Sequence, residues 1–199
     1  MTTFLLIRHG ETDAIGKRIM GWNPGWHLNA TGRAQVERLA GRLAHLPIRA
    51  IYTSPLERAS ETAAAIAAPH SLQPQCDEEL GEIRFGVWEG LAIAELEQRK
   101  DFHAYNLFRT GARPPGGGEL MIEVQSRMVR AVTRLAERHP SETVALVSHG
   151  DPLRSLLAWC LGMPLDLLLR FEVGTASVSV VELAEWGPRV MSINRTEAL

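Results

Sequence analysis

The chain has 199 residues and little cysteine, with only Cys76 and Cys160. These two are not closely spaced, and neither is accompanied by a histidine in a metal-binding pattern. A disulfide framework and a zinc motif are therefore excluded. We expect both thiols to be chemically inert.

Long apolar runs are absent as well. No stretch approaches the roughly 20 apolar residues that cross a bilayer, so no membrane partner is expected. The opening Met1-Thr2-Thr3 has no basic residue, and the apolar run that follows is only four residues long. This start predicts no secretory signal and a cytoplasmic location.

An excess of positive charge is missing too. The net charge is -2, which argues against a nonspecific nucleic-acid surface. The hydrophobic fraction of 45% is ordinary for a globular protein, and the length suits one substantial core rather than two. We predict a single domain over residues 1–199, with a small helical or loop insert at about residues 88–118.

What the chain does have is two short apolar runs that each end on a His-Gly pair. The runs read Phe4-Leu5-Leu6-Ile7 before Arg8-His9-Gly10, and Val144-Ala145-Leu146-Val147-Ser148 before His149-Gly150. Short apolar runs bounded by glycine predict buried, parallel strands, whose carboxyl ends hold the ligand site in open α/β sheets. We therefore expect both imidazoles to face one crevice.

A histidine beside an arginine at such a place predicts an anion site with a nitrogen nucleophile, and phosphate is the obvious anion. Nearby guanidinium groups disfavour imidazolium, which helps to keep His9 neutral and nucleophilic. Arg8 can bind phosphate oxygens with its forked donors, and His149 can donate a further hydrogen bond.

Periodic patterns predict the other helices and strands. The first half indicates a helix from an N-cap at Thr31 to about Ala44, a strand over Ala50–Thr53, and a helix from the capping box Ser54-Pro55-Leu56-Glu57 to about Ala67. The second half indicates helical residues over 91–110, a breaker over Arg113–Glu119, a helix with an apolar stripe from Ile122 to Ala136, a helix from an N-cap at Asp151 to about Leu161, and strands over Ala176–Leu183 and Val190–Ile193 around Gly187-Pro188. The strand, helix, strand order implies right-handed parallel crossovers.

Arg58 belongs to the first turn of the second predicted helix, close to the carboxyl end of a strand. There its guanidinium can reach over the same crevice as His9. The alternative is a surface ion pair with Glu57 or Glu61, and position alone does not decide between the two.

Two irregular segments lie where pocket walls are expected. Residues 16–29 hold Trp22 and Trp26, whose indoles either wall a pocket or cap the core. Residues 80–90 mix glycines, aromatic residues and acids, which is typical of a functional loop.

Phosphoryl transfer to a histidine also needs an acid for the leaving oxygen. The acid must stay protonated until attack, so its pKa must be raised by burial or by nearby negative charge. The candidates are Glu82, Glu89, Glu11 and Asp151, and residue chemistry alone does not select Glu82 over Glu89.

Four segments together resemble the histidine phosphatase superfamily, also called phosphoglycerate mutase-like. They are Arg8-His9-Gly10-Glu11-Thr12, Ser54-Pro55-Leu56-Glu57-Arg58-Ala59 with Thr62-Ala63, Glu82 followed by Phe85-Gly86 and Trp88-Glu89-Gly90, and Ser148-His149-Gly150. One Arg-His-Gly string alone is weak evidence for this resemblance, whereas four segments in the right order along most of the chain are strong evidence. The resemblance implies an α/β fold, a three-layer α/β/α sandwich with a mostly parallel central sheet.

By the same resemblance, His9 is the nucleophile that becomes a phosphohistidine, and Glu82 is the general acid and base. The phosphate pocket is formed by Arg8, Arg58, His149 and Gly150. Members of this family need no metal, and the resemblance implies no cofactor.

The chain departs from its apparent relatives at three places. Many of them carry an asparagine beyond the first histidine as a phosphate ligand, whereas this chain has Asp13-Ala14-Ile15-Gly16 and is one residue shorter there. Met20 stands where such phosphatases often have a polar residue, which predicts a less polar wall for the leaving group. Leu120 follows Glu119 where relatives often have serine. The pocket candidates are Arg18, Met20, Trp22 and Glu119.

These features favour a metal-independent phosphomonoesterase that hydrolyses a small phosphorylated metabolite. The alternatives are a phosphoglycerate mutase, and a phosphoprotein phosphatase or a regulatory phosphate-binding module. Against the mutase, the resembling mutases are typically longer, with extra segments that shield the intermediate from water. A pure binding module needs the arginines more than the acid. The sequence leaves a homodimer open and does not name the metabolite.

Overall fold

A six-stranded sheet forms the centre of the computed structural model, which describes residues 1–196. The strands are β1 (Thr2–Arg8), β2 (Ile48–Thr53), β3 (Gln75–Cys76), β4 (Thr143–Ser148), β5 (Val178–Ala184) and β6 (Gly187–Arg195). Their order is β3-β2-β4-β1-β5-β6. The neighbouring strands among β1, β2, β3 and β4 pair in parallel, whereas β5 runs antiparallel to both of its neighbours, β1 and β6. The mostly parallel sheet agrees with the prediction.

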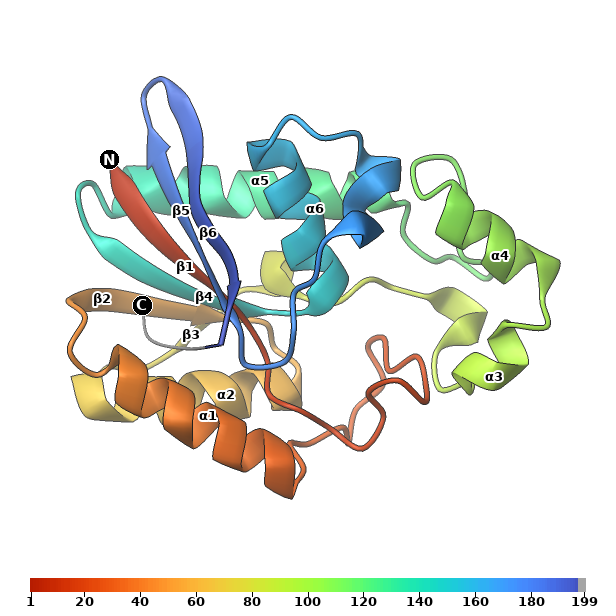
Figure 1. Ribbon diagram of the computed structural model, residues 1–199, viewed down its shortest axis with the longest axis horizontal. Helices are drawn as coiled ribbons and strands as arrows, with labels where there is room; N and C mark the ends of the chain where they lie inside the picture. The colour runs from red at the N-terminus through yellow and green to blue at the C-terminus, as the bar shows by residue number, and fades with distance from the viewer. Residues whose placement is uncertain (197–199) are drawn as a thin grey trace.

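Helices cover both faces of this sheet (Figure 1). They are α1 (Ala30–Leu43), α2 (Glu57–Ala67), α3 (Ile93–Leu96), α4 (Lys100–Leu107), α5 (Met121–Arg138) and α6 (Gly150–Cys160), with short 3-10 turns over Ala68–His70, Glu78–Leu80, Gly86–Trp88 and Leu165–Arg170. α1 and α2 lie on one face and α5 and α6 on the other, while α3 and α4 extend to one side. The three-layer α/β/α sandwich is therefore confirmed.

The alternation of side chains along β1 explains these layers. Phe4 and Leu6 belong to the core on the α5 and α6 side, whereas Leu5 and Ile7 belong to the core on the α1 and α2 side. Successive side chains of a strand point to opposite faces, and a parallel strand buried on both faces is apolar at every position. The continuous run Phe4–Ile7 is the sequence signature of this burial.

A third apolar cluster joins the segment around α3 and α4 to the rest of the molecule. Trp88 is fully buried, with its ring centroid 5.4 Å from those of both Phe102 and Tyr105. Met121 of α5 and Leu168 of the last 3-10 turn belong to the same cluster. The segment 88–118 thus has a core of its own, shared with α5, and its description as an insert in a single domain stays a prediction.

Two helix starts differ from the sequence prediction. The N-cap of α1 is Asn29, whose side chain accepts a hydrogen bond from the Gly32 backbone N–H at 2.8 Å, so Thr31 lies inside the helix. α6 begins at Gly150 with His149 in the N-cap position, so the predicted N-cap Asp151 is already helical. N-caps are recognised by backbone conformation, which composition does not reveal.

The predicted capping box before α2 is also wrong. α2 begins at Glu57, and the N-cap is Leu56, which makes no side-chain capping bond. Pro55 therefore precedes the helix, and the hydroxyl of Ser54 is used elsewhere, as described below.

Smaller differences concern α5 and the last hairpin. Ile122 is 45% exposed and does not belong to the buried stripe of α5, although Met128, Val132 and Leu135 do. The turn between β5 and β6 precedes Gly187, because β6 already begins there.

Within residues 1–196, no helix is long and apolar enough to cross a membrane.

Candidate active site

The carboxyl ends of β1 and β4 bring His9 and His149 together. Arg8 pairs with Ser148 in the parallel register, and the His9 backbone N–H donates to the Ser148 carbonyl at 3.1 Å. The two imidazole rings are buried, with centroids 5.1 Å apart and planes inclined by 61°. Two His-Gly pairs 140 positions apart in sequence therefore meet at one sheet edge.

The hydrogen bond of His9 determines which of its ring nitrogens is free. Nδ1 lies 2.7 Å from the Gly10 carbonyl oxygen, and because a carbonyl only accepts, Nδ1 must carry the proton. Burial holds the pKa of His9 well below its ordinary value, and the charges of Arg58 and Arg8 lower this pKa further. The ring is therefore neutral, with an unprotonated Nε2.

His149 has the opposite arrangement of donor and acceptor. Its Nε2 lies 2.7 Å from Ser54 Oγ, which accepts the Leu56 backbone N–H at 3.3 Å and so has its own hydroxyl proton to donate. Burial, and then the charge of Arg58, lower the pKa of His149 well below its ordinary value. When the Ser54 hydroxyl donates to Nε2, the neutral ring carries its proton on Nδ1, a buried atom without a hydrogen-bond partner.

Arg58 is fully buried, so the surface ion pair considered for it is wrong. Its Nη2 donates to the Gly21 carbonyl at 3.0 Å, while its Nε and Nη1 are buried without a partner. Glu61 instead contacts His27 and accepts the Leu28 backbone N–H.

Arg8 reaches the same place from the end of β1. Its Nη1 donates to the Val173 carbonyl at 2.7 Å, and its buried Nε has no partner. A Cβ atom on Gly150 would lie 3.4 Å from the guanidinium carbon of Arg8, which is ordinary van der Waals contact, so the two residues are close neighbours. The Arg8 guanidinium thus lies beside the first turn of α6, whose N-terminal end favours anions.

Several buried donors on the residues around His9 have no hydrogen-bond partner. Within residues 1–196 they include Arg8 Nε, Arg58 Nε, Arg58 Nη1 and His149 Nδ1. The charges of both arginines act on both imidazoles, which shows that these groups share one neighbourhood. Buried donors normally have partners, and an anion with several oxygens would satisfy all of them at once.

Glu82 lies next to this cluster, on the loop after the second 3-10 turn. Its Oε1 accepts the Ile83 backbone N–H at 3.0 Å, and its Oε2 lies 3.8 Å from Nδ1 of His149. Burial raises the pKa of Glu82 above its ordinary value, and the charge of Asp151 adds to this, although Arg58 opposes it. The carboxyl therefore keeps its proton at a higher pH than an exposed glutamate.

The other candidate acids have structural partners. Glu89 accepts the backbone N–H groups of Phe85 and Trp22. Burial alone would raise the pKa of Asp151, yet ion pairs with Arg109 and Arg154, at 2.8 and 3.0 Å, hold it below the ordinary value. Glu11 accepts the side-chain amide of Asn29 at 3.1 Å. Among the four acids, tertiary contacts thus favour Glu82 for proton transfer.

A cavity of about 250 Å³ opens beside these residues. Its lining consists of Arg8, Ile15, Gly16, Arg18, Ile19, Met20, Gly21, Glu82, Phe85, Ile93, Gly150, Asp151 and Arg154. Of the predicted site residues, this lining includes Arg8, Arg18, Met20, Glu82 and Gly150. Two larger hollows beside α1, of about 570 and 630 Å³, contain none of the buried donors that lack partners.

Trp22 and Glu119 do not belong to this lining, and neither do His9, Arg58 and His149. The Trp22 indole N–H donates to the backbone carbonyl of Glu82 at 2.6 Å, and the Arg84 guanidinium lies 3.9 Å from the centre of its ring. Glu119 pairs with the buried Arg127. Both residues hold the loop that carries Glu82 instead of facing the cavity.

Sequence reasoning missed Ser54, Arg127 and the Arg109–Asp151 ion pair. Ser54 carried a signal, since it directly follows β2, but its pattern with Glu57 pointed to a helix cap. No local pattern distinguishes Arg127 from the other arginines of α5.

Within residues 1–196, no group of three His, Cys, Asp or Glu side chains is arranged to hold a metal ion.

Comparisons with known proteins show the family of this chain. A family model described as histidine phosphatase superfamily (branch 1) matches residues 4–196. The bifunctional protein Rv2228c of Mycobacterium tuberculosis is 37% identical over 98% of this chain, which spans only 54% of that protein. The adenosylcobalamin/alpha-ribazole phosphatase of Escherichia coli is 30% identical over 89% of this chain and 88% of its own length. The structure of YhfR from Bacillus stearothermophilus superposes with a TM-score of 0.91, at 34% identity and 96% coverage of both chains.

Proposed function

The chain belongs to the histidine phosphatase superfamily (branch 1), and on this premise we propose that it hydrolyses phosphate monoesters of small metabolites through a phosphohistidine on His9. The observation that carries the proposal is the set of partnerless buried donors on Arg8, Arg58 and His149, gathered around an imidazole with a free Nε2. An anion site built around a neutral nitrogen suits nucleophilic attack on a bound phosphoryl group.

In the first step, Nε2 of His9 attacks phosphorus. The new N–P bond forms as the bond from phosphorus to the ester oxygen breaks, and the bonding electron pair leaves with that oxygen. The proton of Glu82 neutralises the departing alkoxide, which leaves as an alcohol. Arg8, Arg58 and His149 donate to the non-bridging oxygens, where negative charge is spread in the transition state.

In the second step, the carboxylate of Glu82 takes a proton from a water molecule as the water oxygen attacks the phosphorus. The N–P bond breaks, its electron pair returns to Nε2 of His9, and inorganic phosphate is released. Glu82 is protonated again and the site is restored. The raised pKa of Glu82 suits a group that must act first as an acid and then as a base.

The cavity supports a small substrate with an apolar portion. Its volume is about 250 Å³, and Ile15, Ile19, Met20, Phe85 and Ile93 form much of its wall beyond the anion site. Two of the charged lining residues, Asp151 and Arg154, are paired with each other at 3.0 Å. The similarity to an alpha-ribazole phosphatase is in keeping with a metabolite substrate.

A screen of phosphorylated metabolites tests the proposal when both free phosphate and isomerised product are measured. We expect free phosphate from at least one small monoester. A phosphate label on the quenched protein that is lost in acid and retained at alkaline pH should identify a phosphohistidine, and His9→Ala should lack this label. Isomerised product without free phosphate would make the chain a mutase. Binding of phosphoesters without turnover would make it a binding module.

A further inference from the structure

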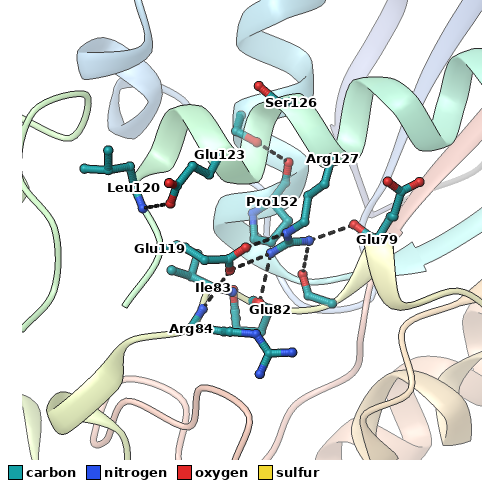
Figure 2. A network of polar contacts seen from close by, with 12 residues as sticks. Glu79, Glu82, Ile83, Arg84, Glu119, Leu120, Glu123, Ser126, Arg127 and Pro152 are labelled. Atoms are coloured by element: carbon teal, nitrogen blue, oxygen red, sulfur yellow. Dashed lines mark hydrogen bonds and ion pairs between the residues drawn. The ribbon is translucent and has the colours of Figure 1, made fainter. Parts of the chain in front are cut away.

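Arg127 is a buried arginine that lies behind the proposed acid and does not face the cavity. It projects from α5, is 9% exposed, and is absent from the cavity lining. Figure 2 shows its guanidinium between Glu119 and the loop that carries Glu82. The catalytic steps above make no use of this side chain.

The guanidinium uses its donors fully, and most of them go to one short loop. Nη1 donates to the carbonyls of Glu79 and Gly81 at 2.7 and 2.8 Å, and Nη2 donates to the carbonyl of Glu82 at 2.9 Å. Nε and Nη2 also bind the two carboxylate oxygens of Glu119, at 3.0 and 3.2 Å. A guanidinium has five N–H donors in a planar fork, and five acceptors are in reach here.

Glu119 ties the other flank of the same loop. Its Oε2 accepts the Arg84 backbone N–H at 2.9 Å, and its own backbone N–H donates to the Arg84 carbonyl at 2.8 Å. The Arg127–Glu119 pair therefore fixes residues on both sides of Glu82. The carboxylate also neutralises the guanidinium, which limits the direct effect of its charge on the site.

The carboxyl group of Glu82 depends on this backbone for its position. Oε1 is held by the N–H of Ile83, the next residue of the loop, and Oε2 has only the 3.8 Å approach to His149. If the loop shifts, the acid shifts with it. A displacement of about 1 Å at a reacting group can lower a rate by roughly 100-fold.

We propose that Arg127, held by Glu119, is a positioning residue that fixes the Glu79–Glu82 backbone and thereby aims the carboxyl of Glu82 at the leaving oxygen. This inference rests on the proposed function, because it takes Glu82 as the acid. Lysine cannot replace the arginine, since it is a point charge without the planar fork that reaches several carbonyls and a carboxylate together.

The test compares two esters whose leaving groups differ in their need for a proton. An alkyl phosphate such as glycerol 2-phosphate needs protonation of its leaving oxygen, whereas 4-nitrophenyl phosphate does not. For Arg127→Lys we expect kcat/KM, which reports the first step, to fall roughly tenfold or more with the alkyl ester and much less with the aryl ester. Glu119→Gln removes the charge but keeps one oxygen acceptor. We expect it, too, to lose more activity with the alkyl ester than with the aryl ester, but by a smaller factor.

Arg130→Met is the matched control. Arg130 lies one turn from Arg127 on α5 and binds the Glu79 carboxylate at 3.0 Å, but its side chain is 65% exposed and it contacts no carbonyl of Gly81 or Glu82. We expect this variant to hydrolyse both esters at the rate of the unaltered protein. Thermal unfolding and circular dichroism identify variants that do not fold, in which case Glu119→Gln carries the test.

A double variant separates this proposal from the proposed function. Arg127→Lys combined with Glu82→Gln should be no slower on the alkyl ester than Glu82→Gln alone, because positioning an absent acid has no value. Equal losses of kcat/KM for both esters in Arg127→Lys, or additive losses in the double variant, would overturn the positioning role while leaving the phosphatase intact. If Glu82→Gln itself lowers kcat/KM equally for both esters, the acid is another residue, and the assignment of Glu82 and the positioning role both fail.

Discussion

At the scale of single residues, the position of one proton decides what each imidazole can do. His9 and His149 follow the same His-Gly pattern and are both buried, yet their hydrogen bonds differ. The Gly10 carbonyl holds the proton of His9 on Nδ1 and leaves Nε2 free to attack. The hydroxyl of Ser54 faces Nε2 of His149 and leaves Nδ1–H to donate. Nucleophile and donor are thus distinguished by neighbours and not by residue type.

Ser54→Ala should therefore weaken phosphate binding without removing a phosphate contact. The change leaves Nε2 of His149 without its partner and no longer fixes the proton on Nδ1. We expect KM to rise about tenfold, and the free energy of unfolding to fall by about 1–3 kcal/mol. Steady-state kinetics and urea denaturation measure the two effects.

The control for this variant is Ser60→Ala. The Ser60 hydroxyl donates to the Ser54 backbone carbonyl at 3.3 Å, but it does not touch His149. Its KM should equal that of the unaltered protein. A normal KM in Ser54→Ala would show that the hydroxyl does not set the tautomer of His149.

The raised pKa of Glu82 predicts that the pH dependence of kcat/KM differs between esters with different leaving groups. The acid must be protonated for the first step, so kcat/KM for an alkyl phosphate should be high below this raised pKa and fall as pH increases through it. This falling limb of the kcat/KM profile reports the free enzyme, in which the pKa of Glu82 is raised above the ordinary glutamate value.

Rate profiles between pH 4.5 and 9 for the two kinds of ester measure this limb. For 4-nitrophenyl phosphate the same limb should be weak, because that leaving group departs without a proton. Identical profiles for both esters would assign the limb to another group, such as the phosphate of the substrate.

At the scale of elements, a buried ion pair fastens the segment after α4 to the start of α6. Nη1 of Arg109 lies 2.8 Å from Oδ2 of Asp151, and their side chains are 6% and 17% exposed. Arg109 also contacts the Tyr105 hydroxyl and Asn106. Since Asp151 follows Gly150 directly, this pair links the 88–118 segment to the turn on which Arg8 rests.

Breaking this pair should destabilise the fold. Arg109→Met leaves Asp151 buried with Arg154 as its remaining ion-pair partner, and we expect the free energy of unfolding to fall by about 3 kcal/mol. Urea denaturation measures the loss. Arg99→Met removes the exposed pair with Asp101 at the start of α4 and should leave the stability unchanged. Equal stabilities of the two variants would show that the buried pair contributes nothing to folding.

At the scale of the whole molecule, folding buries two histidines in uncharged form. The pKa values of His9 and His149 lie well below their ordinary value of 6.5, chiefly because of burial, with the charges of Arg58 and Arg8 in the same direction. Below about pH 6.5 the unfolded chain therefore binds more protons than the folded chain. The stability that these two neutral histidines contribute is therefore present above that pH and is lost as pH falls.

His9→Asn should remove part of this pH dependence. The difference in unfolding free energy between pH 7.5 and pH 5.5, measured with urea, should be smaller in the variant than in the unaltered protein, by up to about 1.4 kcal/mol per pH unit. Glu82 acts in the opposite sense in both proteins, because it holds its proton more tightly when folded, so it cancels from the comparison. His45→Asn, at an exposed position between α1 and β2, is the control and should leave the difference unchanged. A variant with the same pH dependence as the unaltered protein would contradict the burial of neutral His9.

Much of the fold was predictable because its signals are local. The runs Phe4–Ile7 and Val144–Ser148 are apolar at every position since both faces of the sheet are covered, and the order of strands and helices allows few topologies. The exact helix starts at Asn29 and His149 were missed, because capping depends on backbone conformation and on partners several residues away. Trp22 and Glu119 were assigned to the pocket since nothing in their own sequence shows which way they face.

The sequence by itself determined the chemistry at the strand ends. Arg8 and His9 are joined covalently, and a buried strand must deliver both to its carboxyl end, so an arginine beside a nucleophilic imidazole followed from sequence alone. The tertiary structure decided which acid lies next to them, which hydroxyl sets the second imidazole, and which arginine holds the acid in place. Glu82, Ser54 and Arg127 come from separate segments, and their roles arise from hydrogen bonds and burial that exist only when distant parts of the chain are packed together.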